Sequence, residues 1–474
     1  MAGETRLSWL TLSAFAGPTI AVGALGIPLG VYLPAYYAGH LGVDLGAVGV
    51  AFAAVQIIAI LFDPAVGFGL DATQTRFGRF KPWMLISGPV LALATVAVFM
   101  APPGIGVAYL IGWQLLLYFG LSMSGMSTNA WGAVLAPDYH ERSRLYAWVQ
   151  VIGYTGALIC LFLPAILNAL GDADEVSVVH TMGWLVIVLA PLSALIAVTT
   201  VREPVSAQAG RERIRFAEYV ALIRRPAMVR LLSACLLLTS APALTGALYF
   251  FFFHQALGFS FDQSTTLLLI YIAAGLLMSL WARIARLLGK HRALMAAAFA
   301  SAVVQCALLV LPRGMFWPMA IAMLIAGFAA NCYNLLFNAM VADVSDEIRL
   351  ETKQDRTAPL FALMTAAAKI GAAVPLAITF PILKAVGFNA AAGAHNTPAA
   401  IHGLENCFVF APVLAMALGG ACLWGYHLNA ERHGEIRKRL EESDAALLAG
   451  GLATEPMLSP ATHIAAPVEL DAAS

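Results

Sequence analysis

The segment 63–83 reads DPAVGFGLDATQTRFGRFKPW and follows an apolar run, 47–62, whose one strongly polar side chain is Gln56. Its first residue, Asp63, is therefore a carboxylate inside a stretch apolar enough to cross a membrane. Such a charge costs about 2.5–3.5 kcal/mol on insertion scales, so it needs a proton, a metal ion or a basic side chain as a partner. Four more charged residues precede the next apolar run: Asp71, Arg76, Arg79 and Lys81. We expect Asp63 to be an intramembrane switch with a cytoplasmic turn at 71–81 behind it.

The composition of the chain indicates a membrane protein. Its 474 residues are 60% hydrophobic and 11% charged, and the mean hydropathy is +0.80. No water-soluble domain of this length covers so much apolar surface, so we expect many membrane-spanning segments in a lipid bilayer. The formal net charge is zero, and we expect no nucleic-acid partner. The six cysteines form no CxxC or other ligand spacing, which favours packing roles.

Apolar runs long enough to span a bilayer recur twelve times along the chain. They cover 9–38, 44–70, 83–102, 106–135, 145–170, 178–201, 227–257, 263–282, 293–312, 315–342, 357–383 and 403–428. The predicted fold class is an all-α membrane protein with twelve transmembrane helices.

The basic residues predict the orientation. Of the 27 Lys and Arg residues, 24 fall near the ends of the chain or in alternate loops, and the other loops hold only Arg313 and Lys384. Because basic residues gather on the cytoplasmic side, both termini should lie in the cytoplasm, with the chain in the inner (plasma) membrane. The remaining cation, Lys369, lies inside the run 357–383.

The most basic loop separates two halves of six helices each. We expect a first half at 1–201, a cytoplasmic linker at 202–226, a second half at 227–428 and a largely disordered cytoplasmic tail at 429–474. The short basic loop at 76–81 has a counterpart at 286–292, at the same place in the second half. This repeat favours a parallel duplication, as in the major facilitator fold.

Lys369 is the second intramembrane charge. It is too far from the ends of its run to reach the membrane surface easily, so we expect its partner to be an acid across the bundle or an anionic group on a substrate. The alternative is a residue of an aqueous vestibule without a coupling role.

Polar and aromatic side chains on several helices are candidates for a substrate cavity. Asn331, Asn334 and Asn338 have the spacing of one helix face. They would line a wet cavity or form hydrogen bonds between helices. Trp131 would stack on a sugar ring or only fill space in the core. The other candidates are Tyr36, Tyr37, Gln56, Thr128, Asn129, Gln150 and Tyr154.

Charged clusters follow the fourth and tenth runs at matching places in the two halves: Asp138, Glu141, Arg142, Arg144, Asp343 and Asp346. Together with Asp71, Arg76, Arg79 and Lys81 they are expected to form cytoplasmic gates, in which carboxylates meet arginines of neighbouring loops when that side closes. Solvated turns are the alternative.

The chain has no GxxxxGK[ST], HExxH or GxSxG motif. We therefore expect neither a nucleotide-driven pump nor a hydrolase, and no cofactor. Energy would come from an ion gradient.

The sequence resembles the glycoside–pentoside–hexuronide:cation symporters of the major facilitator superfamily from about residue 20 to residue 430. The resemblance rests on the segment 63–83, on WGAVLAPDYHERSRL at 131–145, and on MVADVSDE at 340–347 followed by AAAKIG at 366–371. It implies that Asp63 is the carboxylate of the coupling cation, that Lys369 is a functional lysine, and that 76–81 is part of a gate loop.

The chain departs from the melibiose permease, the best-known member of that family. The second acid of that protein's sodium site corresponds to Ala59, its sugar-binding acids to Gly23 and Thr128, and its helix 5 arginine to a position near Gln150. A sodium ion requires several oxygen ligands, whereas a proton requires one carboxylate. The departures therefore favour H⁺ over Na⁺, and Asp63 would be a metal ligand only if sodium is used.

We expect a monomeric, cation-coupled secondary symporter that moves a small-molecule substrate, such as a sugar, glycoside or uronide, by alternating access. Sodium-dependent lysophospholipid transporters resemble the chain in the same acid and lysine, so a lipid substrate is one alternative. A membrane sensor or scaffold without transport activity is the other.

Overall fold

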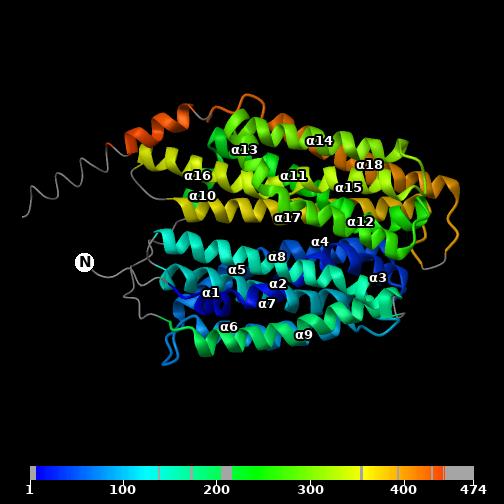
Figure 1. The fold of residues 1–474 in the computed structure, drawn as a ribbon, viewed down its shortest axis with the longest axis horizontal. Coiled ribbons are helices and arrows are strands. Elements are labelled where there is room, and N and C mark those ends of the chain that lie inside the picture. The colour runs from blue at the N-terminus through cyan, green and yellow to red at the C-terminus, as the bar shows by residue number, and fades with distance from the viewer. Residues whose placement is uncertain are drawn as a thin grey trace, which may run out of the picture.

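The computed structural model describes residues 7–136, 139–170, 174–203, 216–352, 356–391, 394–428, 431–440 and 442. Within these ranges, eleven helices are long and apolar enough to cross a membrane, and a further apolar stretch, Phe261–Leu277, is shorter. The helices form one bundle in which the N-terminal half lies against the C-terminal half (Figure 1). The predicted all-helical fold with twelve spans is confirmed.

The N-terminal half contains nine α-helices and one π-helical segment among the described residues. They are α1 (Trp9–Ala16), α2 (Pro18–Ile27), η1 (Pro28–Tyr32), α3 (Leu33–Gly39), α4 (Leu45–Ala59), α5 (Phe62–Ala72), α6 (Lys81–Phe99), α7 (Val107–Leu135), α8 (Tyr139–Leu170) and α9 (Glu175–Thr200).

The C-terminal half follows α10 (Phe216–Ile223). Its elements are α11 (Pro226–Phe250), η2 (Phe251–Ala256), α12 (Phe261–Ala273), η3 (Ala274–Leu277), α13 (Met278–Leu288), α14 (Lys290–Val310), α15 (Phe316–Ala330), α16 (Cys332–Thr352), α17 (Thr357–Ala385) and α18 (Pro398–Cys422).

Irregular segments recur at matching places in the two halves. The first spanning helix of each half contains a π-helical stretch, η1 or η2, and the second is interrupted, between α4 and α5 or at η3. The loop after the second helix holds a glycine with positive φ in each half, Gly78 at +114° and Gly289 at +87°. These matches support an internal duplication.

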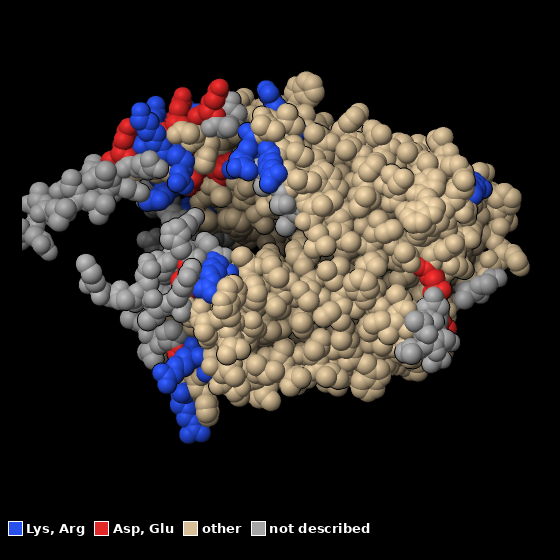
Figure 2. Space-filling view, in the orientation of Figure 1, with Lys and Arg blue, Asp and Glu red and all other residues tan. Residues whose placement is uncertain are grey.

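The two ends of the bundle differ in packing and charge. Lysines and arginines gather at one end, where the molecule is hollowed between the halves (Figure 2). We call this the basic end and the opposite one the sealed end. Both halves contribute to one buried apolar cluster that includes Tyr32 and Phe250, whose rings lie 4.8 Å apart. Two other clusters each belong to a single half. The halves are therefore closed on each other at the sealed end and open at the basic end.

Several helices extend further than the apolar runs predicted. α8 begins at Tyr139, α13 ends at Leu288 and α16 continues to Thr352. The predicted ends are wrong there because an apolar run stops at its first charges, whereas backbone hydrogen bonding continues through residues whose charges reach solvent. Asp343 and Asp346 consequently lie inside α16 and not in a turn after it.

Parts of the predicted linker and tail pack against the C-terminal half. Glu218 of α10 forms an ion pair with Arg356 at 2.8 Å. A helix at 431–440 buries Ile436 and Leu440, which are 2% and 8% exposed, in the apolar cluster of that half. Residues 204–215 of the linker and 443–474 of the tail lie outside the described residues.

Candidate ion and substrate site

Asp63 and Lys369 meet at the boundary between the two halves. Nζ of Lys369 donates a hydrogen bond to Oδ2 of Asp63 at 2.7 Å, and the side chains are 31% and 27% exposed. Asp63 lies on α5 of the first half and Lys369 on α17 of the second. The acid and the base thus form an ion pair that joins the halves and remains accessible. Its role in coupling stays a prediction.

Pro64 explains why the helix is interrupted just before Asp63. Proline has no N–H to donate to the carbonyl of Ile60, so one bond of the regular helix is lost at this point. Instead, Ile60 and Leu61 donate to carbonyls three residues back, at 3.2 and 3.0 Å. α5 then begins at Phe62, which puts Asp63 in its first turn. The free N–H groups and dipole of a helix start favour a carboxylate there.

The surroundings of Asp63 on α4 offer few oxygen ligands. Ala59, one turn earlier, is 1% exposed and contributes only a methyl group. Gln56, which is partly buried, supplies the one side-chain oxygen on α4.

α4 and α17 are in close contact between the Asp63–Lys369 ion pair and the sealed end. A Cβ atom on Gly49 of α4 would lie 2.6 Å from Cβ of Phe380 and 2.7 Å from the carbonyl oxygen of Leu376, both on α17. Only glycine allows this approach without displacing the backbone. At the outer limit of the contact, Lys384 binds Asp44 at 2.6 Å. This bond is the main reason why the pKa of the Asp44 carboxyl lies below its usual value. Two ion pairs therefore join α17 to the N-terminal half: Lys384 with Asp44, just before α4, and Lys369 with Asp63 of α5.

Four of the predicted cavity residues are buried, so their assignment to a cavity wall is wrong for this conformation. Tyr36 is 4% and Tyr37 0% exposed, and the Tyr37 hydroxyl donates to the carbonyl of Val98 at 2.7 Å. Both tyrosines belong to the cluster that closes the sealed end.

Thr128 and Trp131 are the other two predicted cavity residues that are buried. Thr128 is 2% exposed and donates to the carbonyl of Ser124 at 2.9 Å. Trp131 is 0% exposed and packs edge-on against Phe15 at 5.4 Å. The spacing of residues in a sequence does not show whether an aromatic ring faces a cavity or the core, and here packing prevails.

The three asparagines do not share one environment. Asn331 ends α15, donates from its side chain to the carbonyl of Gly327 at 2.7 Å and lies against Gly275. The side chains of Asn334 and Asn338 are exposed on α16. Asn334 and Asn338 are one turn apart on α16, whereas Asn331 lies at the interruption between α15 and α16. Their role in lining a cavity stays a prediction. Asn129, Gln150 and Tyr154 also have exposed side chains and remain candidates.

The gate residues of the N-terminal half form contacts within that half. Nε of Arg79 donates to the carbonyl of Leu70 at 2.7 Å, and Arg144 binds Glu141 at 3.1 Å. Lys81 lies over the ring of Trp131, and Arg76 lies over Phe77. Asp138 lies outside the described residues, as do the side chains of Asp71 and Arg142.

Glu203 is a residue that the sequence reasoning missed. Its carboxylate accepts hydrogen bonds from the backbone N–H groups of Arg79, Phe80 and Lys81 at 2.5 to 3.2 Å. These groups begin α6, where a carboxylate compensates the unpaired donors and the helix dipole. A single acid after a spanning helix gives no signal of this contact.

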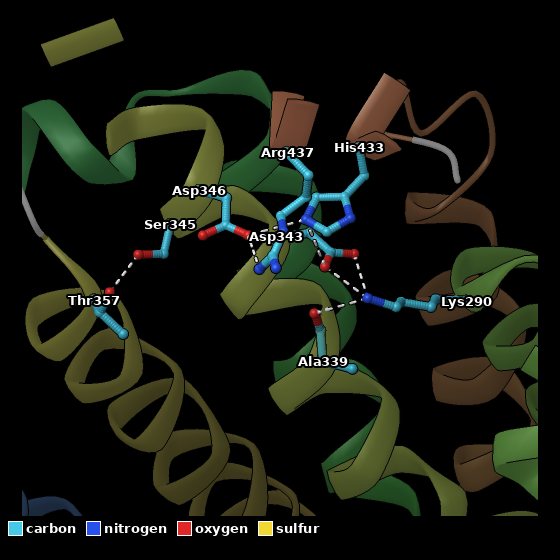
Figure 3. A network of polar contacts seen from close by, with 8 residues as sticks. All are labelled: Lys290, Ala339, Asp343, Ser345, Asp346, Thr357, His433 and Arg437. Carbon is cyan, nitrogen blue, oxygen red and sulfur yellow. Dashed lines mark hydrogen bonds and ion pairs between the residues drawn. The ribbon is translucent and has the colours of Figure 1, made fainter. Parts of the chain in front are cut away.

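The gate residues of the C-terminal half meet the tail helix (Figure 3). Asp343 of α16 binds Lys290 at 2.6 Å and His433 at 3.3 Å, and His433 also binds Asp346 at 3.0 Å. Arg437 lies 3.9 Å from Asp346. These contacts stay within one half, as expected for an open basic end.

Known proteins match almost the whole chain. The family described as MFS/sugar transport protein matches residues 14–430. The chain belongs to this family. A curated relative, the uncharacterized symporter YnaJ of Bacillus subtilis, is 21% identical over 455 residues, which cover 94% of this chain and 97% of the relative. The glucuronide carrier protein homolog of Escherichia coli is 22% identical over 444 residues, which cover 91% of this chain and 95% of the relative.

Solved structures share the fold. The nucleoside transporter NupG has a TM-score of 0.66 at 14% identity, and the match covers 88% of this chain and 100% of that transporter. A bacterial homolog of the human lysosomal transporter Spinster, in an inward-facing conformation, has a TM-score of 0.63 at 15% identity, and the match covers 92% of this chain and 99% of that homolog. This family member is therefore a multi-pass membrane transporter.

Proposed function

We propose that the chain is a cation-coupled symporter of a sugar-type substrate that works by alternating access. The basic end and both termini would face the cytoplasm. A monomer would be sufficient for transport, because the ion pair lies within one chain. The observation that carries the proposal is the Asp63–Lys369 contact at 2.7 Å. An acid and a base that join two moving halves inside a membrane form a contact that ligands can open or close.

Charge compensation would couple the ion to the substrate. In the described conformation Lys369 neutralises Asp63. A cation that binds Asp63 competes with the lysine for the same carboxylate. Whenever one of the two charges is left unpaired as the halves close, the cost is about 2.5–3.5 kcal/mol. The halves would therefore move only in states in which the charges are balanced, which makes transport coupled.

The carboxylate clusters at the basic end would form its gate in the opposite conformation. Glu141, Asp343 and Asp346 now bind partners within their own halves. Closing the basic end would bring these carboxylates and the arginines of the facing loops together.

We propose the proton as the coupling ion. Asp63 has only the methyl group of Ala59 one turn away, and the oxygen of Gln56 lies beyond it. Sodium would have few ligands there, whereas a proton needs only the carboxylate.

Uptake by purified protein in lipid vesicles tests both parts of the proposal. We expect an inward proton gradient to drive accumulation of a glycoside or uronide, and sodium to have no effect at fixed pH and membrane potential. Sodium stimulation under these conditions would refute the choice of proton and leave symport intact. Accumulation of lysophospholipids in place of sugars would refute the substrate class.

A further inference from the structure

The charges inside the membrane restrict the chemistry of the substrate. Lys290, at the start of α14, pairs with Asp343 of α16, and Arg313, just before α15, pairs with Glu405 of α18. Each of these pairs lies within the C-terminal half and is neutral by itself. Asp63 and Lys369 instead pair across the boundary between the halves, inside the spans Leu45–Leu70 and Pro359–Ala385. Their charges must be balanced in every state in which the halves move.

The empty and the loaded carrier differ in this balance. In the empty carrier the Asp63 carboxylate and the Lys369 ammonium cancel. A monovalent cation on Asp63 neutralises the acid and leaves the positive charge of Lys369 without a counter-charge. A neutral sugar does not remove this charge, whereas a substrate with one negative charge does. The result is the same for a proton and for sodium.

We infer that the substrate carries one anionic group, a carboxylate or a sulfonate on a sugar, and that Lys369 binds this group once a cation occupies Asp63. The inference rests on the proposed symport. The geometry suits such an exchange, because Nζ of Lys369 already holds a carboxylate oxygen at 2.7 Å. The lysine is 27% exposed, and the bundle is open at the basic end (Figure 2). An anionic group of the substrate would then replace the Asp63 carboxylate as the ion-pair partner of Lys369.

The same balance predicts that transport moves no net charge. One cation and one monovalent anion cross together, and the carrier has the same charge when it is empty and when it is loaded. A gradient of the cation should therefore drive uptake, whereas a membrane potential alone should not. A neutral substrate carried with the same cation would instead respond to the potential.

Three substrates that differ only at C6 of the sugar test the inference. They are methyl glucoside, methyl glucuronide and the methyl glycoside of 6-deoxy-6-sulfoglucose, supplied to vesicles under an inward proton or sodium gradient. We expect at least one anionic sugar to enter about 100-fold faster than the glucoside, which corresponds to the cost of an unpaired charge. The carboxylate and sulfonate arms identify the group. Uptake should not change when a potassium-selective ionophore sets the membrane potential.

Variants of Lys369 separate charge from shape. Lys369→Arg keeps the charge and should keep the preference for the anionic sugar. Lys369→Gln removes the charge and should abolish this preference. Lys384→Gln is the control, because it removes a lysine from the same helix at the sealed end and should leave the ratio of the two uptake rates unchanged.

Each outcome separates the inference from the proposed function. Entry of the glucoside as fast as both anionic sugars, or uptake of an anionic sugar driven by membrane potential alone, would overturn the inference and leave symport of a sugar intact. If no sugar entered under either gradient, the proposed function would fail, and the inference with it.

Discussion

Lys369 holds Asp63 at 2.7 Å across the boundary between the halves while the basic end is open. The ion pair therefore exists in a conformation from which ligands can leave, so the empty carrier is electrically balanced at the moment it must return. This relationship makes Asp63 the most informative residue to change.

Asp63→Asn should abolish accumulation and spare exchange. The amide keeps the shape of the side chain and leaves Lys369 unpaired in the empty carrier, which lowers the rate of its return by about 100-fold. Exchange of an anionic substrate does not require the empty carrier to return, so it should continue. Vesicle uptake and counterflow measure the two rates. Asp44→Asn, at the sealed end, is the matched control and should keep accumulation. Uphill uptake by Asp63→Asn at the normal rate would refute the coupling role.

Gly49→Val should disfavour closure of the sealed end. The added atoms would meet Phe380 and the backbone of Leu376, and overpacking of this kind costs about 1–3 kcal/mol. A cysteine at Gly246, which faces Gly30 and Val31 of the other half, should then react faster with a thiol reagent applied from that side. Gly26→Val is the control, since a Cβ there meets nothing within 4 Å. Equal labelling of the two variants would refute the role of this contact.

The Asp44–Lys384 pair should make the sealed end sensitive only to strong acid. Its formation lowers the pKa of Asp44 from the usual 3.8, so its stabilising effect is complete above that value and is lost as the pH falls through the lowered pKa. An exposed pair contributes less than about 1 kcal/mol. Because the thiolate is the reactive form, labelling of the cysteine at Gly246 is divided by that of an exposed reference cysteine at the same pH. This ratio should stay constant from pH 5 to 7 and change less than about fivefold in Lys384→Gln. A large change between pH 5 and 7 that Lys384→Gln removes would contradict this assignment.

The orientation in the membrane can be tested with single cysteines. Cysteines at Ser177 and Thr397 should react with an impermeant thiol reagent from outside the cell, whereas cysteines within 206–212 should react only after the membrane is opened. Cys306 is exposed in the structure, so it is first replaced by serine. The reverse pattern would place both termini outside the cytoplasm.

Ile436→Ala should destabilise the C-terminal half. Ile436 is 2% exposed against the apolar cluster of that half, and truncating such a side chain costs about 2–4 kcal/mol. The thermal unfolding temperature of the purified protein should fall. Lys438→Ala, on the exposed face of the same helix, should leave it unchanged. Equal unfolding temperatures would show that the tail helix does not contribute to stability.

The sequence determined the features that depend on composition and on local chemistry. Hydrophobicity and length predicted the twelve spans, and the two motifs around Asp63 and Lys369 predicted the family and the intramembrane charges. A charge in an apolar run is visible without any tertiary information, because its cost in a membrane does not depend on which helices are neighbours.

Only the tertiary structure decided which side chains meet. Residues 63 and 369 are far apart in the chain, and the packing of α4 against α17, with α5 following α4, brings them to 2.7 Å. Packing also turned Trp131 and Tyr37 into the core, and it brought His433 of the tail to Asp343. The direction of a side chain depends on how helices rotate and are interrupted within the bundle, and the spacing of residues along one helix does not contain that information.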